Sequence, residues 1–96
     1  MKKAREQVFA NVGDAIADSP AESASLELRF QLMEKISGIL KKNGWTQKEA
    51  AKRCGVTQPR INDLLRGRIA RFSVDALVNI ASALGSRIRL TLEDAA

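Results

Sequence analysis

The chain has 96 residues, enough for one small domain with a modest hydrophobic core. Its 16 Lys and Arg side chains against 11 Asp and Glu give a net charge of +5, which favours a polyanionic partner over an enzyme for acidic substrates. Because there is no histidine and only one cysteine, neither an intramolecular disulfide nor the usual zinc ligand sets can form, and we expect no metal and no cofactor.

The N-terminal extension, residues 1–18, carries weak structural signals. It has no sustained apolar core of the kind that a signal peptide needs, and no run in the chain approaches the ~20 apolar residues that span a bilayer. We therefore expect a soluble chain in a reducing cytoplasm, with no membrane association. Segment 5–12, REQVFANV, is compatible with a short strand or with a helical turn.

A long first helix is predicted from Ser19 onward. Ser19 can cap it, Pro20 suits the first helical position, and Glu22 completes a capping box. Apolar residues then recur at three- and four-residue spacing: Leu26, Phe30, Met33, Ile36 and Leu40. With a stop at Asn43-Gly44 the helix spans about 23 residues, or roughly 35 Å.

Two short capped helices follow around a glycine turn. Thr46, with Glu49 three residues later and Trp45 as a staple, starts the second helix, which is predicted to end near Arg53. The turn is Cys54-Gly55-Val56. Thr57 then caps a third helix that ends at Gly67, with Pro59 in its first turn. This arrangement, with Ala51 and Gly55 allowing the helices to cross closely, is typical of a helix-turn-helix.

The two faces of the third helix predict how the motif meets DNA. An inner set is expected to hold the motif on the domain: Ala50, Cys54, Val56, Ile61 and Leu64. The opposite face carries Gln58, Asn62 and Asp63, with Arg60 at its flank. Gln58 and Asn62 can read adenine, Arg60 can read guanine, and Asp63 can accept from cytosine or serve only as a partner of Arg60. Phosphate contacts are assigned to Gln47, Lys48, Lys52, Arg53, Arg66, Arg68 and Arg71.

The positive charge is concentrated on this motif. Residues 41–71 hold nine basic and two acidic side chains, a net of +7, whereas residues 1–40 and 72–96 each have a net charge of −1. The combination of motif and charge predicts a DNA-binding domain. An enzyme is not expected, because no histidine, carboxylate pair or phosphate-binding glycine loop is evident and Cys54 lies in the turn.

A fourth helix and a strand are predicted to complete the chain. Ser73 caps the helix, Phe72 and Leu77 form a staple, and Gly85 ends it. In residues 86–96 the apolar Ile88, Leu90 and Leu92 then alternate with polar side chains, as in a half-buried strand. A lone strand leaves its backbone groups unpaired, so we expect it to pair with its copy in a two-fold dimer. Pairing with segment 5–12 in the same chain is the alternative.

The motif residues resemble the lambda-repressor-like, Xre-type helix-turn-helix family, through T-Q-x-E-A-A at 46–51 and G-V-T-Q-P-R-I-N-D-L-L-R-G at 55–67. The resemblance covers roughly residues 34–85. It implies a mainly α domain of four to five helices over residues 19–85 with the motif at 46–67, to which the C-terminal strand is added. It also supports Gln58 as a base reader and Gln47 as a phosphate contact, whereas Pro59 replaces a polar base-reading side chain of several family repressors.

The wider layout is similar to HigA-type antitoxins, in the V-F-x-x-[LV]-G segment at 8–13, the long first helix, R-F-S at 71–73 and the C-terminal strand. This resemblance implies a repressor that binds a palindromic operator as a homodimer and neutralises a RelE/HigB-like ribonuclease toxin, with residues 1–30 as the expected toxin contact. Two alternatives remain: a stand-alone phage- or plasmid-type regulator without a toxin, and a protein-interaction or coactivator module that uses the fold without reading bases.

Overall fold

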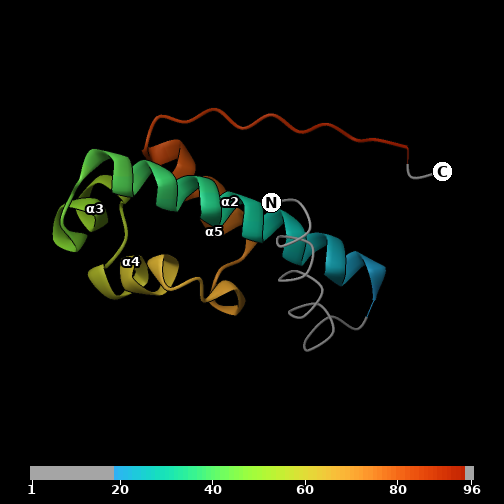
Figure 1. Ribbon diagram of the computed structural model, residues 1–96, viewed down its shortest axis with the longest axis horizontal. Helices are drawn as coiled ribbons and strands as arrows, with labels where there is room; N and C mark the ends of the chain where they lie inside the picture. Colours follow the sequence, from blue (N-terminus) through green and yellow to red (C-terminus); the bar gives the residue numbers. More distant parts are fainter. Residues whose placement is uncertain (1–18, 95–96) are drawn as a thin grey trace.

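The computed structural model describes residues 19–94, which form four α-helices and one short 3-10 helix (Figure 1). The elements are α2 (Pro20–Asn43), α3 (Gln47–Cys54), α4 (Gln58–Leu65), η1 (Ile69–Arg71) and α5 (Val74–Ala83). The N-terminal extension, including segment 5–12, lies outside the described residues. The expectation of a mainly α domain is confirmed for the part of the chain that is described.

All four α-helices start where a capping side chain is predicted. The hydroxyl of Ser19, Thr46, Thr57 or Ser73 accepts a hydrogen bond from the backbone N–H three residues later, at 3.1, 3.1, 3.4 and 3.0 Å respectively. Each bond satisfies a donor that the first turn leaves without a helical partner. The first helix is 24 residues long and ends at Asn43, with Gly44 as its C-terminal cap, close to the predicted length.

The core lies where α2 crosses the bundle formed by α3, α4 and α5. Ile61 of α4 and Leu77 of α5 have no exposed surface at all, and Phe72, which joins η1 to α5, is also fully buried. The remaining buried members of this cluster are Met33, Ile36, Leu40, Ala50, Ala51, Cys54, Leu64, Ile80 and Ala81. The predicted inner residues of the motif therefore face the core, with Val56 packed at its margin.

The turn between α3 and α4 depends on Gly55. Its φ of +70° is a left-handed conformation that side-chain-bearing residues seldom adopt. Its N–H donates to the carbonyls at the end of α3, and the N–H of Val56 donates to Ala51 O at 3.0 Å. The small Ala51 is buried at the helix crossing, as the sequence predicts.

The predicted C-terminal strand does not form within the described residues. Residues 86–94 are an extended segment without ladder hydrogen bonds, which leaves the helical body beyond α5 (Figure 1). The exposed fraction of its apolar residues rises along the chain, from 41% at Ile88 to 72% at Leu90 and 90% at Leu92. A strand requires a partner for its backbone groups, and residues 19–85 offer none in a single chain.

Candidate DNA-binding surface

The start of α4 and the start of α3 meet in one shallow depression on the surface. It is lined by Gln47, Gln58, Pro59 and Asn62. Gln58 is exposed and Asn62 is half-buried. Within residues 19–94, no hydrogen bond occupies the side-chain amide of Gln58 or Asn62, so both are available to base edges. The structure thus brings two predicted base readers together with the predicted phosphate contact Gln47.

Asp63 is placed differently from the prediction. The expectation that it lies on the exposed face of α4 is wrong, because the residue is buried, with 7% of its surface exposed. Its carboxylate accepts from the Arg68 guanidinium at 2.9 Å and from the Arg71 guanidinium at 3.3 Å. Neither a cytosine contact nor the alternative pairing with Arg60 agrees with this geometry, so Asp63 organises the chain after α4 instead.

The two arginines also set the ionisation of Asp63. Burial raises the pKa of this carboxyl, but the hydrogen bonds and charges of Arg71, followed by those of Arg68, outweigh burial and hold the pKa below its usual value. The folded state therefore favours the carboxylate, and folding gains stability from this group above the unfolded-state pKa, which is about 3.9. That gain is lost as the pH falls through the lower folded-state pKa.

The Asp63→Asn variant is expected to have a lower melting temperature than the wild type at pH 7, because the amide carries no charge for Arg68 and Arg71 to neutralise. The difference should shrink as the pH is lowered below about 4, where the wild-type carboxylate also becomes protonated. Thermal unfolding followed by circular dichroism between pH 7 and pH 2.5 measures both effects. Glu93→Gln, in the exposed C-terminal segment, is the control, and an equal loss in both variants would refute the role of Asp63.

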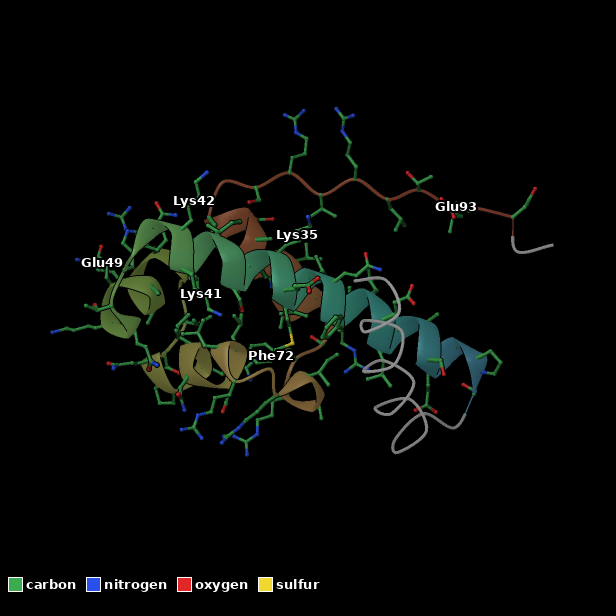
Figure 2. The ribbon with its side chains drawn as sticks, viewed as in Figure 1. Lys35, Lys41, Lys42, Glu49, Phe72 and Glu93 are labelled. Carbon is green, nitrogen blue, oxygen red and sulfur yellow. The ribbon has the colours of Figure 1, made fainter. Side chains whose placement is uncertain are left out.

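Arg60, the predicted guanine reader, is also engaged inside the chain. Its guanidinium carbon lies 4.2 Å from the centre of the Phe72 ring, and one of its nitrogens donates to the Arg71 carbonyl at 2.8 Å. Phe72 is labelled in Figure 2, in the interior beside α4. A guanidinium held by a ring face and a carbonyl must give up both contacts before it can reach a base. In this structure Arg60 ties α4 to the chain that follows it.

The predicted phosphate contacts divide into free and engaged cations. Lys48, Lys52 and Arg66 are exposed. Arg53 remains half-exposed although it pairs with Glu49 at 3.0 Å and lies 4.7 Å from the centre of the Trp45 ring. Arg68 and Arg71 also retain exposed side chains while they bind Asp63. Several nitrogen-tipped side chains project from the edge formed by α4 and η1 (Figure 2), which is the geometry that binding to a polyanion needs.

Arg29 of α2 is a functional candidate that the sequence did not reveal. One of its guanidinium nitrogens donates to Ile69 O at 3.4 Å and to Phe72 O at 3.2 Å. Its contacts lie 40 and 43 residues away in the chain, and no periodicity or motif around Arg29 indicates them. For an arginine in a long amphipathic helix, the sequence alone predicts a solvent-exposed side chain.

Cys54 is buried, and burial raises the pKa of its thiol. Between residues 19 and 94 there is no cluster of three or more Cys, Asp or Glu side chains that could hold a metal ion. In the same range, no helix has the length and apolar character needed to cross a membrane.

The chain matches the model of a known protein family. A family model described as a helix-turn-helix domain matches residues 15–93, which is most of the chain and includes α2 to α5 and nearly all of the C-terminal segment. No curated protein matches the chain. A domain of this kind indicates a DNA-binding regulator, in agreement with the basic surface around α3 and α4.

Proposed function

The chain belongs to the helix-turn-helix domain family, and we propose that it is a sequence-specific transcriptional repressor that binds a palindromic operator as a homodimer. The observation that carries this proposal is the depression shared by Gln47, Gln58 and Asn62. It presents the unpaired amides of Gln58 and Asn62 on one face of α4, inside the segment where the positive charge of the chain is concentrated. The proposed activity is binding rather than catalysis.

The proposed docking places α4 in the major groove. Gln58 and Asn62 then meet base edges, while Gln47 and the first-turn N–H groups of α3 face the phosphates. Lys48, Lys52 and Arg66 supply further phosphate contacts on either side of α4. In a two-fold dimer the two copies of α4 enter successive major grooves about 34 Å apart, which is why a palindromic operator is expected.

The C-terminal segment supports the dimer. Its start, residues 86–89, and α2 together line a hollow whose α2 side includes Leu32, Ile36 and Ile39. Leu32 and Ile39 are only half-buried in the single chain, and Leu90 and Leu92 lie beyond the hollow with most of their surface exposed. Pairing of two such segments satisfies their backbone groups and buries these side chains, each leucine contributing about 1.5–3 kcal/mol on full burial.

The test of the repressor is binding to DNA from upstream of its own gene. Fluorescence anisotropy should show preference for that DNA over a scrambled duplex, and the logarithm of the affinity should fall linearly with the logarithm of the salt concentration, by about 0.9 for each phosphate contacted. Equal affinity for both duplexes would favour the protein-interaction module instead. Replacing Gln58 would not affect the binding of such a module to its partner.

We further propose that the repressor is the antitoxin of a type II pair, which neutralises a RelE/HigB-like toxin and autoregulates its operon. The resemblance of its layout to HigA-type antitoxins supports this, together with the length of α2, whose first half extends beyond the helices of the motif. The proposed toxin contact is residues 1–30, of which 19–30 are described and begin α2.

One simple observation distinguishes the antitoxin from the stand-alone regulator: the presence of a small toxin gene beside the gene of this protein. Co-expression of the neighbouring gene product should arrest growth, and the full chain should restore it. Loss of rescue on deletion of residues 1–18, with operator binding retained, would place the contact in the extension. If no neighbouring product is toxic, the stand-alone regulator is the correct description.

A further inference from the structure

The segment after α4 is held from two sides by arginines that do not belong to it. We call residues 66–72 the basic loop, since it carries Arg66, Arg68 and Arg71. Arg60 donates to the Arg71 carbonyl at 2.8 Å from the α4 side. Arg29 donates to the carbonyls of residues 69 and 72, at 3.4 and 3.2 Å, from the α2 side. The basic loop is thus fixed through its backbone carbonyls by two guanidinium groups.

Arg29 connects the basic loop to the first half of α2. Its Nε donates to Ser25 O at 3.4 Å, which anchors the guanidinium on its own helix. Next to it, Leu26 is buried with 3% of its surface exposed, and Glu22, Leu26, Arg29 and Ala70 line one shallow depression. The contact is therefore a small interface between α2 and η1, with an apolar side chain and a charged donor side by side.

The basic loop has little regular secondary structure, and the buried Phe72 side chain anchors its C-terminal end in the core. Its regular part is the three-residue η1, which follows Gly67, whose φ is +71°. The side chains of Arg68 and Arg71 converge on Asp63, which fixes the tips of these side chains. The Ile69 carbonyl accepts from the Phe72 N–H at 3.2 Å as well as from Arg29, and the Phe72 carbonyl accepts from Arg29. A loop that is ordered before binding loses less conformational entropy when it meets its partner.

We propose that Arg29 is a positioning residue for DNA binding, which holds the basic loop so that Arg66, Arg68 and Arg71 are presented together to the phosphates. Arg29 itself contacts no DNA in this arrangement. The inference rests on the proposed function and adds a coupling between the first half of α2 and DNA affinity. A partner that draws Arg29 away from the carbonyls of residues 69 and 72 weakens DNA binding, and a partner that reinforces the contact strengthens it.

The coupling acts on affinity and not on sequence preference. The side chains of the basic loop are assigned to phosphates, whereas the base-reading amides of Gln58 and Asn62 line the separate depression that they share with Gln47. Loosening the basic loop should therefore weaken binding to all DNA sequences by the same factor. It should also flatten the salt dependence, since fewer phosphates are neutralised at once.

The test compares Arg29→Gln and Arg29→Lys with Lys35→Gln, an exposed charge on the same helix that is labelled in Figure 2. Arg29→Gln should weaken binding to operator and scrambled DNA alike by roughly 10-fold and reduce the salt slope by about 2, the share of two phosphate contacts. Lys35→Gln should change affinity less than about twofold, because it removes one distant, screened charge. Arg29→Lys keeps the charge but not the two-carbonyl geometry, and should remain impaired.

The outcomes separate the possible explanations. If Arg29→Lys binds like the wild type and Arg29→Gln matches Lys35→Gln, Arg29 acts only as a charge and the proposal is overturned. Hydrogen exchange without DNA provides a second measurement, in which the amides of residues 68–73 should exchange faster in Arg29→Lys while those of α4 do not change. Faster exchange throughout would mean a merely structural role. If the wild type shows no DNA binding, the proposed function fails. The hydrogen-exchange result still tests whether Arg29 holds the basic loop in place.

Discussion

Replacing both Leu90 and Leu92 with serine is expected to convert the proposed dimer to a monomer. It should also weaken binding to the full operator by about 10²–10⁴-fold, because the second half-site is then no longer reached at a high effective concentration. Both side chains are largely exposed in the single chain, so the helical domain loses no core contact. Affinity for an isolated half-site should not change. Analytical ultracentrifugation measures the first effect, and titration of full and half operators the second.

Thr91→Ala is the matched control, since Thr91 alternates with the two leucines and occupies the opposite face of an extended segment. It should leave the dimer intact. A chain truncated after Gly85 should behave like the double serine variant. If the truncated chain or the double serine variant remains a dimer at micromolar concentration, the two-fold contact lies elsewhere, and the apolar residues of the C-terminal segment require another explanation.

The helices of this protein follow from local chemistry, which is why the sequence predicts them well. The hydroxyls of Ser19, Thr46, Thr57 and Ser73 cap the helix starts that the spacing indicates. A capping hydrogen bond reaches only three residues along the chain, so its effect is visible in a short stretch of sequence. The apolar spacing in α2, α4 and α5 likewise identifies most residues of the core.

The errors on α4 come from contacts beyond the helix. Asp63 lies two residues after the buried Ile61, so helical geometry alone places it on the outer face. The basic loop then folds back over that position and covers it, and the Arg68 backbone N–H donates to the Asp63 carbonyl at 3.0 Å. Because the chain folds back here, the Phe72 ring and the Arg71 carbonyl also come within reach of the Arg60 guanidinium. No local pattern specifies this return.

The C-terminal segment shows a different limit. Alternation of apolar and polar residues predicts a strand, but a strand forms only when its backbone groups bond to a neighbouring strand. The described residues of a single chain contain no other strand to which this segment could pair. The pattern therefore describes a surface that needs a partner. Its high exposure at Leu90 and Leu92 is consistent with that description. Arg29 is the converse case, a residue with no pattern whose place is set entirely by tertiary structure.

Gln58→Ala is expected to relax sequence preference at one base pair in each half-site. A bidentate amide contact to adenine is worth about 1–3 kcal/mol of discrimination, so a symmetric dimer loses about 2–6 kcal/mol between the correct operator and one altered at both positions. The physical reason is the position of Gln58, exposed at the first residue of α4 with its amide unoccupied in the depression beside Gln47. Binding to scrambled DNA should be nearly unchanged.

Lys48→Ala is the matched control, because Lys48 is exposed in the first turn of α3 and is assigned to a phosphate. It should weaken operator and scrambled DNA by the same factor and lower the salt slope by about 1, without any change in base preference. Competition binding against a panel of single-base operator variants distinguishes the two behaviours. If Gln58→Ala instead lowers every affinity equally, α4 docks by its backbone contacts alone. Sequence preference must then come from Asn62 or from the shape of the operator.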